Sequence, residues 1–527
     1  AIESTDFHSV DVNSVEMLRP RSVAVEHVAL ETVRAVGLDA KLVELGFNQR
    51  QLASAIGQLV ARMAAPGSEL YTHAWLQHHS AVGELIDHDF ANTGLMQLYR
   101  IADKLYTHKA TLEAFLYRRA RDLFEFEEVI TLYDLTNTYF EGTGAGNANA
   151  AFGHSKEKRS DCPLVTLALV LDASGFPKRS EIFPGNVSEP KTLAKMLAKL
   201  APEHAVPEPG GPEQVAPEQI APEQMDFIPS AKTPTVVLDA GIATEQNIAW
   251  LVEHHYAYVV VSRKRQRQFD AEQAVLVKDD GDTTVKAQRL VNDNGEVELY
   301  CHSSAREHKE QGIHELSAKR FEAALEKLAA GLHTARTVKQ YPKVLQRLGR
   351  LKQKYARAAR YYDIEVEHDA PSSNATAITW TRITPIAQTL PGVYCLRTNQ
   401  SQWDTATLWR TYTMLTDLEA VFRSLKSELG LRPVFHSKAR RVNAHLFISV
   451  LAYHLVHHIR TQLKADGNTL SWEDLRRQLT GQDRITVQLK RADGHTIHVR
   501  RSTRAEPRQQ RIYDSLGLSD RPGKTEK

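Results

Sequence analysis

An almost continuous apolar run, Leu164 to Leu171 (LVTLALVL), limits the fold more than any other stretch of this chain. A strand that is apolar on both faces must be covered on both faces. The run is far too short to cross a bilayer, which takes roughly 20 residues, so we expect no membrane partner. We therefore predict an α/β protein whose sheet lies between layers of helices.

Strand and helix candidates on both sides of this run follow a definite order. The strand candidates cover 128–136, 163–175, 177–186, 233–244 and 256–263, and the helix candidates cover 188–200 and 244–254. Ser188 is expected to cap the first of these helices. Three strands, a helix, a strand, a helix and a strand are the order of an RNase H-like core. The repeated segment Pro212 to Gln224 (PEQVAPEQIAPEQ) cannot bury a core, and we expect it to be an extended insertion.

The stretch Thr411 to Arg432 (TYTMLTDLEAVFRSLKSELGLR) predicts one amphipathic helix that ends at Gly430 and Pro433. Its apolar stripe consists of Leu418, Val421, Phe422, Leu425 and Leu429. Tyr412, Glu419 and Lys426 are seven residues apart, so an α-helix places them along one edge. Arg423 lies one turn after Glu419. A solvated face with an ion pair is the alternative interpretation of this edge.

Two aspartates, Asp134 and Asp239, lie at or near the ends of buried strand candidates. An ionised carboxylate there is costly unless a positive charge meets it, and Mg²⁺ is a hard cation that prefers oxygen ligands. Glu419 would complete a site of three carboxylates. Each aspartate alone is equally consistent with a turn-capping role. Glu428 is a weaker third acid, because it falls about 180° around the helix from Glu419.

Net charge is only +2, so a polyanion would have to bind local basic patches. The candidates are Arg263-Lys264-Arg265-Arg267, Lys438-Arg440-Arg441 and Arg500-Arg501-Arg504. Together they make nucleic acid a candidate partner, although each alone is typical of a solvated surface.

Other residue types indicate where the protein works. Three cysteines, Cys162, Cys301 and Cys395, are widely separated, which fits a reducing cytoplasm and excludes a cysteine zinc site. The first residues lack the pattern of a secretory signal. The histidines at 454, 457 and 458 have helical spacing and are candidates for a transition-metal site, but core histidines in an apolar helix are the alternative.

Several blocks of sequence, taken in order, resemble bacterial insertion-sequence transposases of the DDE class. The blocks are LYDLTNTYFEG, GHSKEKRSDCPLVTLALVLDASGFP, IFPGNVSEPKTL, VVLDAGIATEQNI, GVYCLRTN and LEAVFRSLKSELGLRPVFH. The likeness covers most of residues 127 to 465 and is to the branch with a Tyr-x2-Arg-x3-Glu-x6-Lys signature. By this resemblance Asp134, Asp239 and Glu419 match the catalytic and metal-binding acids. Tyr412 and Lys426 match the signature, whereas Leu415 stands where the branch has Arg.

The resemblance implies cut-and-paste transposition with two Mg²⁺ ions, for which Mn²⁺ can substitute. The protein would bind double-stranded DNA, both at the terminal inverted repeats of the transposon and at the target. It would also bind a second copy of itself to form a homodimer. The protein would be located in the cytoplasm of a bacterium, and on the nucleoid when it is bound to DNA. Arg423 is our candidate to replace the missing Arg, and Arg263 and Lys264 are candidate DNA contacts. Trp380 and Trp403 are candidates for holding a flipped base during a hairpin step.

The predicted organisation has five parts. They are a helical N-terminal domain with a candidate role at DNA ends (1–125), a first part of the RNase H-like core (126–265, with the Pro-rich insertion at 206–230), an insertion domain (266–400), a second part of the core with the catalytic helix (401–465), and a basic C-terminal tail for DNA contact or dimerisation (466–527). Two alternatives remain open: a repressor or scaffold that binds DNA without catalysis, and an RNase H-like nuclease without strand transfer.

Overall fold

The computed structural model describes residues 8–124, 130–155, 159–198, 234–263, 267–370, 372–383 and 390–526. The repeated Pro-rich segment, Pro212 to Gln224, and Lys264 lie outside these ranges. The chain forms two compact units, one of Ala1–Val237 with Thr413–Lys527 and one of Leu238–Tyr412. The fold is a mixed α/β fold, as the apolar run predicted.

Four strands, the last of which ends at the boundary of the first unit, run side by side in the order β4-β3-β2-β5. Their bounds are β2 Ile130–Tyr139, β3 Leu164–Asp172, β4 Pro177–Pro184 and β5 Thr235–Leu238. β3 is antiparallel to both β2 and β4. Every residue of β3 is buried, which confirms that this strand is covered on both faces. β2 extends three residues beyond the predicted strand end at 136, so Asp134 lies in its middle and the prediction that it lies near the end was wrong.

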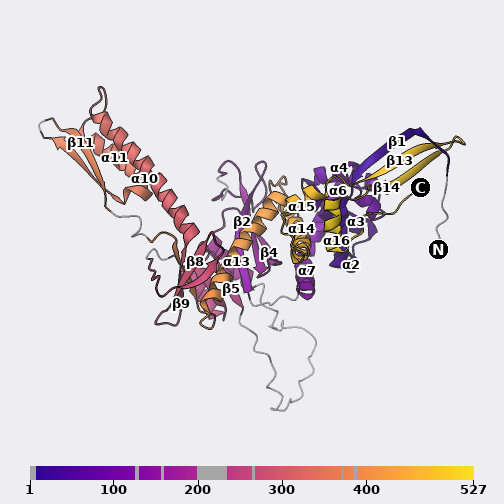
Figure 1. Cartoon of the computed structure of the whole chain (residues 1–527), viewed down its shortest axis with the longest axis horizontal. Helices are drawn as coiled ribbons and strands as arrows, with labels where there is room; N and C mark the ends of the chain where they lie inside the picture. Colours follow the sequence, from indigo (N-terminus) through magenta and orange to yellow (C-terminus); the bar gives the residue numbers. More distant parts are fainter. Residues whose placement is uncertain are drawn as a thin grey trace, which may run out of the picture. The chain divides into compact units, whose positions relative to one another are not determined.

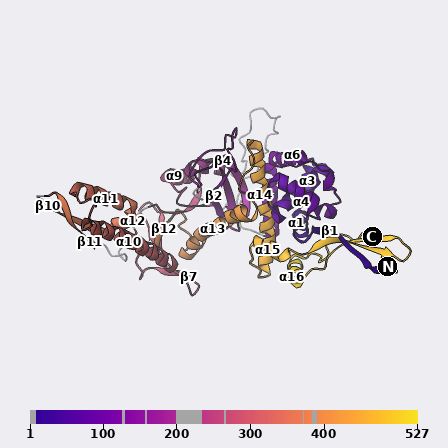
Figure 2. The ribbon, with the colours of Figure 1, turned by 90° about the horizontal axis from the view of Figure 1, so that it is seen from above.

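Helix α14 (Ala439–Ala465) is the central helix of this unit, and several of the other helices pack against it. The others are α1 Ala24–Ala35, α2 Leu38–Glu44, α3 Gln49–Ala64, α4 Glu69–His78, α5 Val82–Leu85, α6 Leu95–Thr107, α7 Lys109–Phe124 and α8 Leu193–Ala198. Figures 1 and 2 show α14 between strands β2–β4 and helices α3 and α6. α14 therefore forms the common wall of the sheet and the helical part. The helix after β4 begins with a short 3-10 turn in which the Ser188 side chain makes no cap, contrary to prediction.

The two ends of the chain meet in a three-stranded antiparallel sheet. Strands β1 (Val10–Ser22), β13 (Asp483–Arg491) and β14 (Thr496–Ser502) lie in that order. Helices α15 (Trp472–Leu479) and α16 (Pro507–Leu516) accompany them. Arg500, which we expected in a surface patch, is buried and forms a 2.7 Å ion pair with Glu84. Its charge is therefore used inside the fold.

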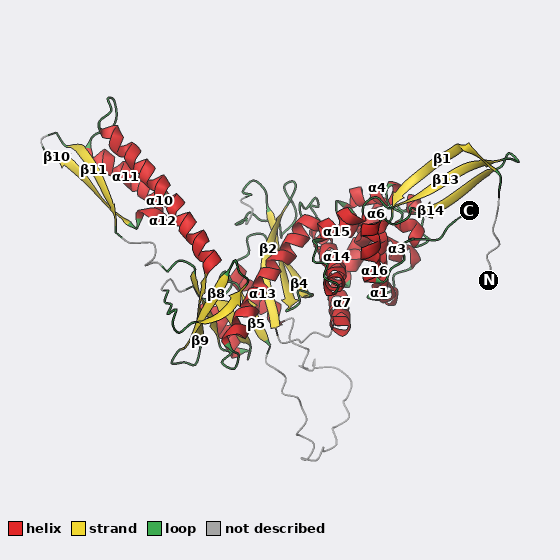
Figure 3. Ribbon diagram, in the orientation of Figure 1, coloured by secondary structure: helices red, strands yellow, loops and turns green. Residues whose placement is uncertain are grey.

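The second unit has its own strands, in the order β6-β12-β9-β8-β7. Their bounds are β6 Ala257–Val261, β7 Val275–Asp279, β8 Thr284–Val291, β9 Val297–Ser303 and β12 Val393–Thr398, and helix α9 spans Glu245–Glu253. Between β9 and β12 the chain forms a lobe of α10 (Ser304–Leu332), α11 (Tyr341–Lys354), α12 (Ala356–Ala359), β10 (Tyr362–Asp369) and β11 (Asn374–Arg382). Figure 3 shows both long helices of the lobe beside its hairpin. No helix in the described ranges is long and apolar enough to span a membrane.

Of the three predicted histidines of α14, His454 and His458 are buried in the core, and His457 is partly buried. Burial lowers the pKa of His454 to about 3 and those of His457 and His458 to about 4. His457 Nε2 lies 2.7 Å from the carbonyl oxygen of Ser174. These rings are therefore neutral in the folded protein at pH 7, as the core alternative predicted.

We predict that the folded state loses stability as the pH falls from about 6.5 towards 4. The unfolded chain binds protons at these histidines below their ordinary pKa, whereas the folded chain does not until the pH is far lower. Urea unfolding at several pH values measures the effect, and His454→Gln, which removes one titrating ring, should make the dependence shallower. An unchanged slope in that variant would contradict the assignment of His454 as a buried neutral base.

Candidate active site

Asp134 is half-buried in the middle of β2, where it pairs across the sheet with Leu169 of β3. Its Oδ1 atom accepts a hydrogen bond of 2.7 Å from the backbone N–H of Leu135. The neighbours Tyr133 and Leu135 are buried. A carboxylate in this setting is held in place by a rigid strand, which is the property that a precisely placed ligand or catalytic acid needs.

Asp239 directly follows β5 and is exposed. Its carbonyl oxygen accepts hydrogen bonds of 3.0 Å from the N–H groups of Ile242 and Ala243, so a tight turn begins here. The Arg263 guanidinium donates to the carbonyl oxygens of Ala240 and Gly241. Arg263, predicted to contact DNA, therefore also supports the turn that carries Asp239.

Glu419 is exposed on helix α13, which spans Thr405–Arg423. The helix does not continue to Arg432 as one α-helix, because Ser424–Glu428 form a π-helical turn in which the N–H of Leu429 bonds to the carbonyl oxygen of Ser424 at 3.1 Å. The prediction that Lys426 shares the edge of Glu419 rested on continuous α-helical spacing, and the π turn removes that basis, so the placement of Lys426 stays a prediction. π turns within helices are frequent at functional sites.

The segment after the π turn is bonded to the end of β2. The N–H of Val434 donates to the carbonyl oxygen of Tyr139 at 2.9 Å, and the N–H of Glu141 donates to the carbonyl oxygen of Val434 at 2.8 Å. Thr138 Oγ1 donates to the carbonyl oxygen of Leu431 at 3.2 Å. The strand that carries Asp134 and the helix that carries Glu419 are thus fastened together within the first unit.

Gly430 makes the turn between that helix and that segment possible. Its φ is +60°, a conformation that costs other residues free energy, and a Cβ atom here would lie 2.9 Å from Cβ of Pro66. Arg62 of α3 donates to the Gly430 carbonyl oxygen at 3.1 Å. The α-helix itself ends at Arg423, but the helical segment including the π turn ends just before Gly430, as predicted, and Arg62 ties this end to the helical part.

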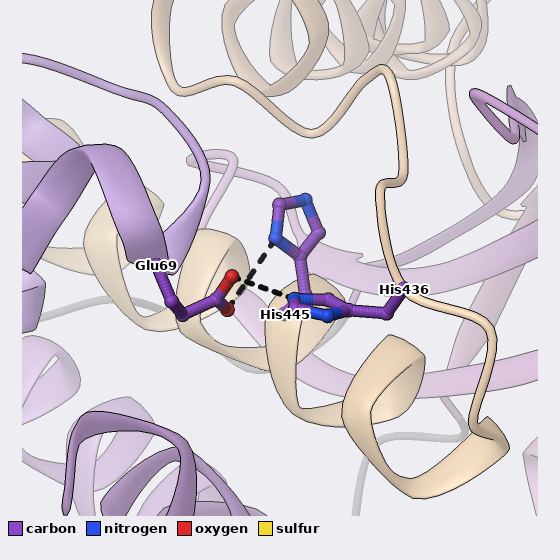
Figure 4. Close-up of side chains that lie close together, drawn as sticks. All are labelled: Glu69, His436 and His445. Carbon is purple, nitrogen blue, oxygen red and sulfur yellow. Dashed lines mark hydrogen bonds and ion pairs between the residues drawn. The ribbon is translucent and has the colours of Figure 1, made fainter. Parts of the chain in front are cut away.

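A cluster of Glu69, His436 and His445, in which Glu69 and His445 are buried and His436 is partly buried, supports the same segment (Figure 4). His436 Nε2 lies 2.6 Å from Glu69 Oε2, and His445 Nδ1 lies 3.8 Å from Glu69 Oε1. Burial opposes ionisation of Glu69, but its contacts with His436 and His445 outweigh burial and hold its pKa well below the ordinary value. Burial lowers the pKa of His445.

This cluster has the residue types of a metal site, but its neighbour argues for a charge network. Arg62 is buried, and its guanidinium lies 3.2 Å from His445 Nδ1, the atom a metal would need. A second cation beside that guanidinium would be repelled. We therefore interpret Arg62, Glu69, His436 and His445 as an ionic network that fixes the segment after the π turn.

A cavity of about 600 Å³ lies beside the residues that follow Glu419. Ala420 and Val421 of α13 line it, together with Ser174, Arg460 and Lys464. The described residues that line this cavity include no carboxylate. A cavity with two basic side chains and no acid suits an anionic group such as a phosphate.

The other residues predicted to contact DNA have varied surroundings. Arg423 is the exposed last residue of α13, and Tyr412 lies with its ring centroid 5.9 Å from that of Tyr394. Trp380, on β11, packs against the apolar core of the lobe, and Trp403 accepts a hydrogen bond at its carbonyl oxygen from Arg289. Glu428, the rejected third acid, accepts hydrogen bonds from Ser424 and from the backbone of Glu473, so it has a structural role.

Sequence reasoning missed the ionic network around Glu69. No sequence motif predicts this network, because its members Glu69, His436 and His445 are far apart or irregularly spaced in the sequence. The one available signal was Arg62, an ionisable residue within the apolar pattern of α3, because a buried guanidinium needs polar partners.

Comparison with known proteins adds one finding to this geometry. The model of a family described as Transposase DDE domain matches residues 125–455, which is more than half of the chain and includes Asp134, Asp239 and Glu419. A search of curated proteins gave no match.

We predict that Glu69→Gln lowers the free energy of unfolding by about 3 kcal/mol, because Arg62 and His436 lose their buried counter-charge. Urea unfolding measures the change. Glu44→Gln is the control, because Glu44 pairs with Lys41 while 67% exposed and should cost roughly 0.5 kcal/mol or less. Equal effects of the two substitutions would show that the network does not stabilise the fold.

Proposed function

Because the chain belongs to the transposase DDE domain family, we propose that it cleaves DNA at transposon ends and joins the exposed 3′-hydroxyl to target DNA. Membership of this family makes it a transposase and an enzyme that acts on DNA. The observation that carries the finer proposal is that all three predicted acids fall inside the family match. One is on a central strand, one at a strand end and one on a helix tied to that central strand.

Asp134, Asp239 and Glu419 are the residues proposed to hold two Mg²⁺ or Mn²⁺ ions. Within the described ranges, neither Asp239 nor Glu419 forms an ion pair with a basic side chain, so both retain oxygen lone pairs for a cation. When bound, the ions would stabilise the attacking and leaving oxygens of an in-line displacement. These carboxylates fit hard cations, which take oxygen ligands.

Two phosphoryl transfers make up the proposed reaction. In the first, a water oxygen attacks phosphorus at the transposon end, the bond from phosphorus to the 3′ oxygen breaks, and a 3′-hydroxyl and a 5′-phosphate result. In the second, that 3′-hydroxyl attacks a phosphorus of the target, whose own 3′ oxygen leaves. The number of phosphodiester bonds is unchanged in the second step, so it needs no further energy source.

Three finer features belong to this proposal. The strands β2 to β6 would form an RNase H-like core, the chain would act as a homodimer on two transposon ends, and Tyr412 and Lys426 would serve as in the Tyr-Arg-Glu-Lys branch. Leu415 departs from that branch. The exposed guanidinium of Arg423, four residues after Glu419, supports its proposed role as the substitute phosphate ligand.

The test is cleavage of DNA carrying the inverted repeats that flank the gene, in the presence of Mg²⁺. We expect the wild type to cleave, and we expect Glu419→Gln to lose cleavage while it still binds the DNA. Glu473→Gln, which changes an exposed acid of α15, should cleave normally. Cleavage by Glu419→Gln would contradict the proposal. Cleavage without joining of a supplied 3′-hydroxyl end would favour a nuclease, and binding without cleavage by the wild type would favour a repressor.

A second prediction concerns Arg423. Arg423→Ala should bind end DNA roughly tenfold more weakly, because a charge-assisted contact contributes about 1.5 kcal/mol or more, and Arg423→Lys should recover part of the loss. Arg410→Ala removes an exposed arginine earlier in the same helix and serves as the control. Wild-type affinity in Arg423→Ala would exclude the substitution of Arg423 for the missing family arginine.

A further inference from the structure

The lobe between β9 and β12 carries its charges unevenly. Helix α10 has five basic and five acidic residues, so its net charge is zero. Helix α11 has five basic residues and no acidic one. From Lys339 to Tyr362 the chain contains eight lysines and arginines and not a single acid. Such a run is much more basic than the whole chain, whose net charge is only +2.

Helix α11 separates this charge from its apolar residues. Val344 and Leu348 are buried in the core of the lobe, against α10 and the β10–β11 hairpin. Lys343, Arg347, Arg350 and Lys354, which we call the α11 stripe, are all exposed. Their spacing of four, three and four residues places them on one face of the helix, over a length of about 16 Å.

The α11 stripe is not neutralised by the protein. Within the described ranges none of its four residues forms an ion pair with a carboxylate, and Lys354 only lies over the ring of Tyr355, at 5.3 Å. On α10, by contrast, Arg306 pairs with Glu310 at 2.9 Å. Four like charges in a row repel one another, so their arrangement is stabilised when a polyanion binds.

The hairpin of the lobe has the opposite charge. Asp363, Glu365, Glu367 and Asp369 alternate along β10 and are exposed, while the residues between them face the helices. The acids therefore point away from the core of the lobe. A polyanion would be repelled by this side, which restricts it to the side of α11.

We propose that the α11 stripe binds the phosphate backbone of duplex DNA as a second contact surface, separate from the three carboxylates. The inference rests on DNA being the substrate of the protein, as proposed above. DNA carries one negative charge per about 1.7 Å of its axis, so a 16 Å stripe faces several phosphates. Lysine and arginine contacts to phosphates position a protein without reading sequence. The stripe therefore binds DNA regardless of its sequence, a property suited to the flanking or target duplex.

The test measures the affinity of the full-length protein for a random-sequence 40-base-pair duplex. Fluorescence anisotropy gives this affinity over a range of salt concentrations, without divalent metal. The variant is Lys343→Gln, Arg347→Gln, Arg350→Gln and Lys354→Gln together. We expect at least roughly tenfold weaker binding at 0.1 M salt. The slope of log affinity against log salt should become shallower by up to about 3.6, since each phosphate contact contributes about 0.9.

A matched control removes the same charge from the other helix of the lobe. Lys309, Lys319, Arg320 and Lys327 of α10 are exposed, and their replacement by Gln should leave affinity and slope close to the wild type. Equal losses in both variants would show that net charge alone matters and would overturn the proposal. Wild-type DNA affinity in the α11 variant would also overturn the proposal. If that variant instead changed its oligomeric state without a change in DNA affinity, the α11 stripe would be shown to contact the acidic β10 of a second copy.

This experiment is independent of catalysis. Glu419→Gln should bind the random duplex like the wild type, with the same salt dependence. Both proposals would be supported if Glu419→Gln lost cleavage and if the α11 substitutions still weakened binding of the random duplex. An α11 variant that binds normally would overturn only the stripe.

Discussion

The backbone hydrogen bonds between the end of β2 and Val434 are the constraint on which the first unit depends. They join two segments almost 300 residues apart in the sequence, and they leave the helix of Glu419 fastened to the strand of Asp134. The fastening is reinforced by Arg62 at the Gly430 carbonyl and by Glu69 at His436. Because these groups are buried, each needs its partner, so the helix end cannot shift without leaving a charge or a carbonyl unsatisfied.

The placement of charge separates stability from binding. Arg62 and Arg500 are buried against acids or carbonyl oxygens and serve the fold. Arg441, from another predicted patch, lies 3.4 Å from Asp103. The α11 stripe, in contrast, has no carboxylate partner within the described ranges. A run of basic residues in the sequence therefore does not by itself predict a binding site. The burial of these side chains and their ion-pair partners decide whether they can bind a phosphate.

Much of the fold could be predicted because local patterns decide it. The apolar run at β3 and the alternation of strands and helices gave the right elements, and Gly430 gave the right helix end. The π turn at Ser424 could not be predicted, because the apolar spacing of this stretch is that of an ordinary α-helix, and the hydrogen bond from Thr138 to Leu431 that holds the segment after it comes from a distant strand. The ionic network of Glu69 has the same origin: His436 and His445 approach it only after α4 and α14 have packed. Residue types suggested the three acids, but spacing alone could not show their mutual positions.

The proposed chemistry requires that Asp134, Asp239 and Glu419 bind the divalent ions that act on DNA. The most direct measurement is the anomalous scattering of Mn²⁺ in crystals of the protein bound to transposon-end DNA. We expect manganese peaks within about 2.0–2.3 Å of oxygens from all three carboxylates, a range typical of hard cations. Manganese found elsewhere, for instance at Glu69, His436 and His445, with none at these carboxylates would contradict it.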